Sequence, residues 1–283
     1  MSMNILPYIK LLRPHQWLKN LMLFFPPLLS GALIHPGMAS RGLLPFVSFC
    51  CASSTMYVFN DLVDHNRDAL HPDKKFRPLP SGRISRRVAI FLCSLLLLTT
   101  IVTALQLSGK FISLILIYMG VSVLYSMLLR DLPIIDLFCI SLGFVLRLYS
   151  GGEAFDILIS DWLFLTVFLL SIFLSVGKRY SEKRDLGDVA GTHRRTLGIY
   201  PEGFLESVMM LSGAAVLVTY SVYATRTPFM VYSVPLCFFG LLRYLLRIKS
   251  GKTGDPTEAL IKDVPLLATG ILWILLVGWC VYQ

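Results

Sequence analysis

A chain of 283 residues in which 55% are hydrophobic and only 15% are charged is too apolar for an ordinary soluble domain, where about a quarter of residues carry charge. The mean hydropathy of +0.68 supports the same exclusion. The net charge is +9, but the membrane topology described below accounts for it, so we expect no nucleic-acid partner.

Nine apolar blocks follow one another along the chain, each near the roughly 20 residues that cross a bilayer. Several abut, so the count is eight or nine. Because the blocks are continuous rather than alternating, they predict helices and not the strands of a barrel. The sequence therefore predicts an all-α polytopic membrane protein, with residues 1–283 forming a single integral membrane domain. The blocks cover residues 19–35, 42–59, 88–108, 110–129, 132–150, 161–179, 205–225, 228–248 and 264–282.

Basic residues are distributed unevenly between the two sides of these predicted spans. Of the 26 lysines and arginines, only Arg41, Lys110 and Arg226 fall in the connections of one side, and Arg147 lies within a span. Positive residues concentrate in cytosolic connections of membrane proteins. We therefore expect a multi-pass protein of the cell (inner) membrane, with its N-terminus and its active site on the cytosolic side.

The first polar cluster, residues 13–20, precedes the first block and combines cations with a tryptophan. This composition favours capture of a lipid phosphate at the membrane interface, although anchoring of the chain at that interface accounts for the same residues. The candidate substrate-binding residues of this cluster are Arg13, Gln16, Lys19 and Asn20.

The strongest feature follows the second block, where a continuing helix places four polar side chains within about a 100° arc. They are Asn60, Asp61, Asp64 and Asp68. Three carboxylates on one stripe repel one another, so the arrangement favours a bound cation. Mg²⁺ takes one or two protein carboxylates and completes its shell with water and phosphate. We predict that Asp61, Asp64 and Asp68 are catalytic Mg²⁺ ligands for a diphosphate substrate. Asn60 is a substrate-binding candidate, and a solvated helix end is the alternative.

The basic residues that come next lie in a segment with prolines and a glycine, which predicts a loop. Lys74, Arg77 and Arg83 suit phosphate oxygens, and an arginine can bind them through two nitrogens. The competing interpretation is that cytosolic topology alone supplies these charges.

Two charged residues, Asp136 and Arg147, lie inside the fifth block. They share a helix face but lie about 16 Å apart along the axis, so each needs another partner. Charges within a membrane are costly and indicate function or pairing. We expect Arg147 to point into a central cavity towards an anion, with a structural tie between helices as the alternative.

A second charged segment follows the sixth block. Lys178, Arg179 and Tyr180 are candidates for binding phosphate or a sugar hydroxyl, and Glu182 for contacting a metal-bound water. Arg195, further along, is a candidate anion ligand. An ion pair between Lys178 and Glu182, or a solvated surface, accounts for the same residues.

These residues resemble the UbiA superfamily of intramembrane prenyltransferases. Residues 60–68 match its first Asp-rich motif, N-D-x-x-D-x-x-x-D, and residues 77–82 match the Arg-Pro-Leu-Pro-Ser-Gly stretch that follows it. The resemblance covers nearly the whole chain. It implies about nine transmembrane helices around a central cavity, with Mg²⁺ and a diphosphate held at the cytosolic end.

The second Asp-rich motif of that superfamily is replaced here by Gly-Lys-Arg-Tyr-Ser-Glu at residues 177–182. Together with residues 13–20, 71–78 and 146–152, this departure resembles the decaprenyl-phosphate phosphoribosyltransferase branch. That resemblance implies transfer of 5-phosphoribosyl from phosphoribosyl diphosphate to a polyprenyl phosphate, in cell-wall biogenesis. Two alternatives stay open, a prenyltransferase acting on an aromatic or other polar acceptor, and a transporter.

Overall fold

The part of the chain that the computed structural model describes, residues 5–70 and 74–283, contains helices and no strands. The long helices are α4 (Leu43–Val63), α6 (Arg86–Ala104), α7 (Gly109–Met127), α8 (Ile135–Phe155), α9 (Asp161–Leu186), α12 (Phe204–Ala224), α13 (Val234–Lys249) and α15 (Val264–Tyr282). Short α-helices are α1 (Leu6–Leu12), α2 (Phe25–Leu29), α3 (Met38–Arg41), α5 (His65–Ala69), α10 (Ala190–His193), α11 (Arg195–Ile199) and α14 (Pro256–Lys262). The 3₁₀ segments are η1 (Pro14–Phe24), η2 (Lys74–Phe76), η3 (Leu129–Asp131), η4 (Gly187–Val189) and η5 (Met230–Ser233).

Eight segments of the described chain are long and apolar enough to cross a membrane, which confirms the predicted polytopic all-α fold. The block predicted first, residues 19–35, forms the end of η1, the short α2 and a loop instead of one long helix. Pro26 and Pro27 lack the backbone N–H groups that a continuous α-helix needs, which explains the interruption.

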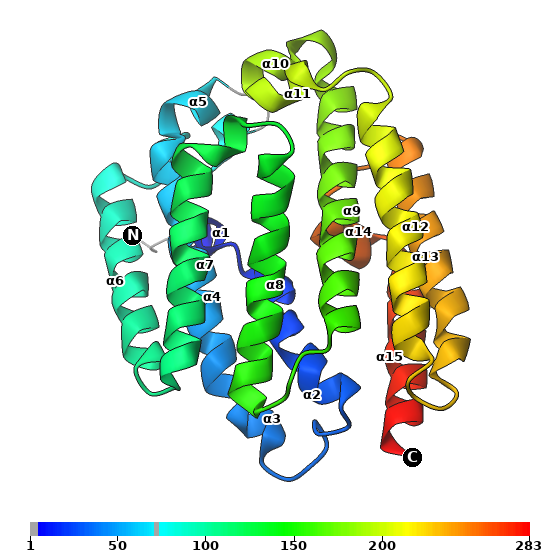
Figure 1. The fold of residues 1–283 in the computed structure, drawn as a ribbon. Helices are drawn as coiled ribbons and strands as arrows, with labels where there is room; N and C mark the ends of the chain where they lie inside the picture. Colours follow the sequence, from blue (N-terminus) through cyan, green and yellow to red (C-terminus); the bar gives the residue numbers. More distant parts are fainter. Residues whose placement is uncertain (1–4, 71–73) are drawn as a thin grey trace.

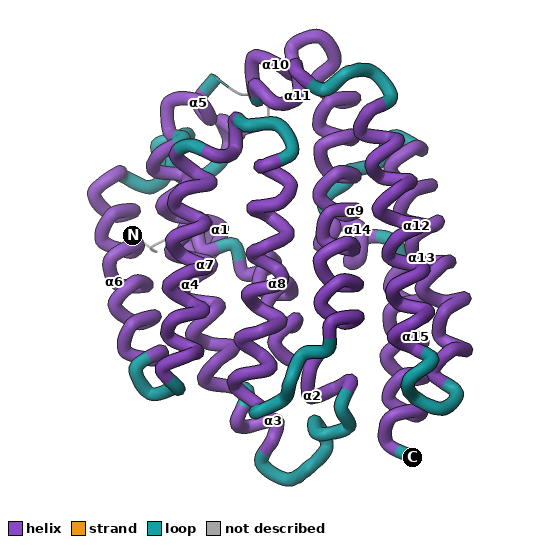
Figure 2. Tube along the Cα trace, in the orientation of Figure 1, coloured by secondary structure: helices purple, strands orange, loops and turns teal. Residues whose placement is uncertain are grey.

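The long helices form two groups that lie beside each other (Figure 1). In the first group α4 packs on α6 and α7, and α7 packs on α8; in the second α9 packs on α12, and α13 packs on α15. Contact between α8 and α9 joins the groups. Connections lie at both ends of the bundle, and α5, α10 and α11 gather at one of them (Figure 2).

The N-terminal segment enters the bundle because of two local features. Arg13 has a left-handed backbone (φ 53°), which ends α1 before Pro14 and redirects the chain into η1. The chain then packs closely on α8, where a Cβ on Gly151 would lie only 2.2 Å from the carbonyl oxygen of Leu23. A glycine at this position therefore lets η1 approach α8 and brings Lys19 and Asn20 into the interior.

Candidate active site

A polar cavity of about 310 Å³ lies between the two helix groups. Its charged and amide side chains are Arg13, Lys19, Asn60, Asp64, Lys74, Arg77, Arg130, Arg147, Lys178, Arg179, Glu182 and Arg194. Tyrosines 57, 118 and 125 also line it. Cations outnumber carboxylates, so the cavity suits a ligand with several negative charges. It brings together most of the residues that the sequence predicted.

The Asp-rich stretch is positioned by the end of α4. The helix stops at Val63, yet the backbone N–H of Asp64 donates to the Asn60 carbonyl at 2.9 Å, and that of Asp68 donates to the Asp64 carbonyl at 2.8 Å. Helical spacing therefore continues through the break into α5. Asp61, Asp64 and Asp68 are all buried, as the predicted stripe requires.

Each of these three carboxylates is paired with an arginine from another segment. Asp61 accepts from Arg13 and, at 3.2 Å, from Arg77. Arg77 also donates to Asp68 at 2.6 Å. A buried carboxylate without such a partner is costly, so these pairs stabilise the stripe. Burial raises the pKa of Asp68, and the neighbouring Arg77 opposes that shift.

Of the three aspartates, Asp64 is the one that lines the cavity, and only one of its two carboxylate oxygens has a hydrogen-bond partner among the described residues. Its Oδ2 accepts from Arg130 at 2.5 Å, whereas its buried Oδ1 has no hydrogen-bond partner among the described residues. A buried acceptor in this state is expensive, and a cation suits it. Asp64 therefore fits a Mg²⁺ ligand.

The other two aspartates fit a metal less directly, because Arg13 and Arg77 already neutralise them. No group of three acidic, histidine or cysteine side chains in the described chain could hold an ion. Since Mg²⁺ needs only one or two protein carboxylates, this arrangement is compatible with Mg²⁺ bound partly by substrate phosphates. The three-aspartate ligand set stays a prediction.

Arg147 both lines the cavity and ties helices together. Its Nε donates to Asn20 Oδ1 at 2.7 Å, its Nη1 to the Gly143 carbonyl at 2.8 Å and its Nη2 to the Tyr118 hydroxyl at 2.9 Å. The guanidinium also lies 4.6 Å from the centre of the Tyr118 ring. Arg147 therefore ties helices together and also faces the cavity, whereas its binding of an anion stays a prediction. Asn20 does not line the cavity; it orients Arg147.

On the opposite wall, Arg179 is fully engaged with protein groups. It donates to Asp136 at 3.0 Å, to Glu182 at 2.6 Å and to the Tyr125 hydroxyl at 3.2 Å. These contacts supply the partner that Asp136 required. Arg179 therefore holds Glu182 in place at the cavity wall, and has less freedom to bind a substrate than the sequence suggested. Helix α9 continues to Leu186, so these residues lie on a helix and not in a loop.

Besides Asn20, Asp61 and Asp68, four predicted residues lie outside the cavity lining of the described residues. Arg83 and Arg195 are exposed and are absent from the cavity lining of the described residues, as is Tyr180, whose ring lies 5.2 Å from the Lys249 ammonium. Gln16 is buried but is not among the described residues that line the cavity. The sequence suggests loops or helix ends at these positions, and such segments have no periodicity that assigns a direction to each side chain. Tyr180 lies within α9 instead. Substrate binding by these residues stays a prediction.

Sequence reasoning missed two cavity arginines. Arg194 takes the place predicted for Arg195, and its Nη1 lies 3.4 Å from Asp136. Arg130, from η3, pairs with Asp64. The one available signal for Arg130 was a single cation in the short connection after α7, on the same side as the Asp-rich stretch.

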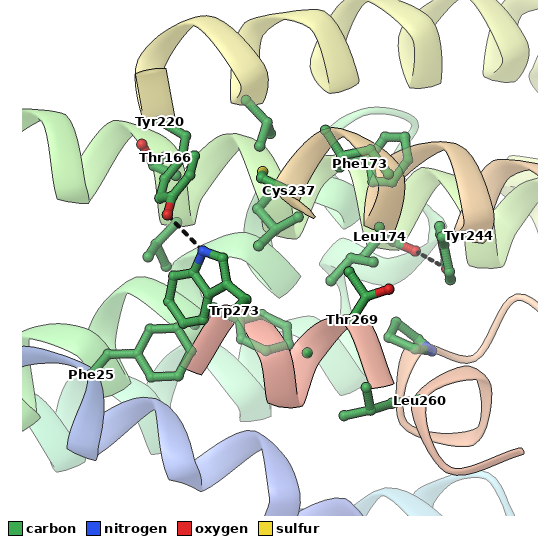
Figure 3. A pocket seen from close by; sticks show the side chains of 18 of the residues that line it. Phe25, Thr166, Phe173, Leu174, Tyr220, Cys237, Tyr244, Leu260, Thr269 and Trp273 are labelled. Carbon is green, nitrogen blue, oxygen red and sulfur yellow. Dashed lines mark hydrogen bonds between the residues drawn. The ribbon is translucent and has the colours of Figure 1, made fainter. Parts of the chain in front are cut away.

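A second cavity of about 400 Å³ is almost entirely apolar. Figure 3 shows its walls, with Phe25, Leu260 and Trp273 around the space and the Trp273 indole donating to the Tyr220 hydroxyl at 2.6 Å. Its lining comes from η1, α2, α8, α9, α12, α13, α14 and α15. Such a space suits a hydrocarbon chain.

The two cavities meet, because both are lined by Lys19, Phe144, Leu174 and Pro256. Burial lowers the pKa of Lys19 to about 7, and the nearby Lys178 acts in the same direction. A cation at the boundary between a polar and an apolar space can hold the anionic head of a molecule whose tail lies in the apolar part.

The fold and the two joined cavities define a helical membrane protein that can bring a polar anionic ligand and an apolar chain together. The chain belongs to the UbiA prenyltransferase family, whose model matches residues 24–267.

Curated relatives match over nearly the whole chain. The decaprenyl-phosphate phosphoribosyltransferase of Mycolicibacterium smegmatis is 31% identical over 97% of this chain and 92% of its own length. The protein of the same name from Mycobacterium tuberculosis is 28% identical over 95% of this chain and 92% of its own length. A solved UbiA homologue from Archaeoglobus fulgidus, bound to GPP and Mg²⁺, superposes with a TM-score of 0.76 at 23% identity, covering 98% of this chain and 99% of its own. This likeness shows the fold.

Proposed function

We propose that this enzyme transfers a 5-phosphoribosyl group from 5-phosphoribosyl diphosphate to a polyprenyl phosphate of the decaprenyl type, and releases diphosphate. The observation that carries the proposal is the junction at Lys19, where a cation-rich cavity meets an apolar one. The names of the full-length relatives point to the same reaction.

The surplus of cations matches this pair of substrates. The donor brings a diphosphate and a 5-phosphate, and the lipid brings a third anionic group, so the three repel one another in a shared space. Arg147 lines the cavity from α8 and Arg194 lines it from the junction of α10 and α11, and Lys74 lies close to the charges of Asp68 and Glu182. Substrates with a single diphosphate need fewer such cations.

The reaction needs no general base. An oxygen of the lipid phosphate forms a bond to C1 of the ribose, while the bond from C1 to the diphosphate oxygen breaks and the electron pair leaves with diphosphate. The nucleophile is already an anion, so the protein acts by positioning the two substrates and stabilising the departing charge. Bound Mg²⁺ would neutralise part of that charge. We propose Asp64 as its first ligand, with Asp68 as a further ligand if Arg77 moves to substrate, and Asp61 if Arg13 also moves.

The lipid substrate also requires that the protein lies in a membrane, with its active site at the membrane surface where the substrates meet. The polyprenyl chain lies in the apolar cavity, and the phosphate lies at Lys19. Basic residues concentrate on the side of the spans that carries Asp64, so the active site and the N-terminus face the cytosol of a cell membrane. Membrane lipid surrounds the eight segments that are able to span it.

The test uses purified full-length protein, Mg²⁺, labelled phosphoribosyl diphosphate and a short-chain polyprenyl phosphate. We expect label in the lipid extract together with released diphosphate. The competing prenyltransferase reaction is tested in parallel with a prenyl diphosphate and an aromatic acid. Prenylated acid from the second mixture, without lipid-linked label from the first, would overturn the proposal.

A further inference from the structure

The segment before α14 packs closely against α9 near the junction of the cavities. The Gly254 N–H donates to Ser181 Oγ at 2.9 Å, and the Tyr244 hydroxyl donates to the Gly254 carbonyl at 2.6 Å. A Cβ on Gly254 would lie 2.5 Å from the carbonyl oxygen of Gly177, so only glycine allows this approach. The residue that follows, Asp255, is therefore fixed in position.

The two carboxylate oxygens of Asp255 have separate tasks. Its Oδ1 accepts from the backbone N–H groups of Thr257 and Glu258 at 3.1 and 3.2 Å and begins α14. Its Oδ2 accepts from Lys178 Nζ at 2.9 Å. The next residue, Pro256, lines both cavities. Asp255 therefore pairs its negative charge with Lys178, a cation of the polar cavity, beside the opening to the apolar cavity.

The charges around this point are coupled. Burial alone would raise the pKa of Asp255, but the ammonium groups of Lys178 and Lys19 hold it well below its usual range. The same carboxylate raises the pKa of Lys19, against the effects of burial and of Lys178. One carboxylate thus serves two lysines, at the place where the lipid phosphate arrives in the proposed reaction.

We propose that Asp255 is a positioning residue for the lipid acceptor, an internal counter-ion that Lys178 exchanges for the acceptor phosphate. The inference rests on the proposed function, because it requires a phosphate-bearing lipid at the junction. A partly buried ammonium without a counter-ion is costly, so Asp255 keeps Lys178 paired until the substrate arrives. A phosphate carries more charge than a carboxylate and displaces it. Because the Lys178–Asp255 pair must break first, the acceptor and the phosphorylated product bind less tightly than they would to an unpaired Lys178.

The test is Asp255→Asn in the full chain, because asparagine keeps an oxygen for the α14 cap and removes the charge. We expect the KM for polyprenyl phosphate to fall about threefold to tenfold. Binding of polyprenyl phosphate without donor should tighten by the same factor, whereas binding of the neutral polyprenol should not change. In a Lys178→Gln background the Asp255 substitution should no longer tighten acceptor binding, because only its charge on Lys19 remains to be removed. Glu258→Gln is the matched control, since Glu258 pairs with Lys262 on the same short helix.

Two results would overturn the inference. One is a KM for the acceptor that rises or stays constant in Asp255→Asn; the other is tighter binding of inorganic phosphate without tighter binding of the lipid. If Asp255→Asn does not fold, Lys178→Gln tests the inference instead. It should raise the KM of the acceptor more than the KM of the donor, and any other result would contradict the inference. The binding arm needs no turnover, so it separates this inference from the proposed reaction. Tighter lipid binding in a protein that makes no product contradicts the reaction alone.

Discussion

The two cavities are built by different kinds of interaction. The polar cavity is closed by ion pairs between separate segments, such as Arg130 with Asp64, whereas the apolar cavity is closed by packing, with a hydrogen bond between Trp273 and Tyr220 at its wall. Ion pairs can be exchanged for substrate charges, while apolar walls hold a chain by the area that they cover. The polar cavity should therefore respond to single charges, and the apolar cavity to volume.

The largest effect is expected at Asp64. Asp64→Asn keeps the shape but removes the charge beside the unpartnered oxygen, and should lower kcat by at least about 100-fold. Diphosphate release measures this. Asp131→Asn is the matched control, because Asp131 pairs with Arg67 outside the cavity lining of the described residues. Full activity in Asp64→Asn would contradict the role of this cavity.

Next comes a change of volume in the apolar cavity. Gly240 lines it on α13, and a Cβ added there would lie 3.9 Å from the nearest atom, Thr269 Cγ2. Gly240→Leu should fill part of the space and raise the KM of a long-chain acceptor about tenfold, with little effect on a short one. Gly120→Leu, on the exposed face of α7, is the control. Equal effects on both chain lengths would place the lipid elsewhere.

A smaller effect separates two adjacent arginines. Arg194 lines the polar cavity and Arg195 is exposed, so Arg194→Gln should raise the KM of phosphoribosyl diphosphate about fivefold to tenfold, and Arg195→Gln by less than about twofold. Initial rates at varied donor concentration measure both. The reverse order would favour Arg195 as the anion ligand, against its exposed position.

The smallest effect concerns pH. Lys19, with a pKa of about 7, faces Lys178 from α9, Arg147 from α8, Arg13 and the carboxylate of Asp255. It loses its proton as the pH rises above 7, whereas the lipid phosphate is already doubly ionised there. The KM of the acceptor should therefore rise severalfold between about pH 7 and 8.5. Lys19→Arg stays charged and should abolish the rise. A rise that persists in this variant would exclude Lys19 as its cause.

Sequence reasoning predicted the membrane helices and the Asp-rich stretch because both depend on local patterns. Long apolar runs determine spans, and the spacing of Asp61, Asp64 and Asp68 survives the end of α4. It also placed Arg147 at a cavity, since a charge within a span is costly unless it is paired or serves function.

The other parts of the site could not be predicted, because they depend on contacts between segments that are distant in the sequence, and periodicity does not encode such contacts. The pairing of Arg130 with Asp64 and of Lys178 with Asp255 joins residues far apart in the sequence. The apolar cavity carries no motif at all, because its lining residues are ordinary membrane-helix residues. The sequence also gives no reason to prefer Arg194 to Arg195, because the short helical segments around them have no pattern that distinguishes the two.

The most direct test is a structure of the full chain with Mg²⁺, phosphoribosyl diphosphate and a short-chain polyprenyl phosphate. We expect the diphosphate beside Asp64, the lipid phosphate at Lys19 and the prenyl chain among α9, α12, α13 and α15. A prenyl chain outside that space, or a lipid phosphate bound away from Lys19, would contradict the proposed function.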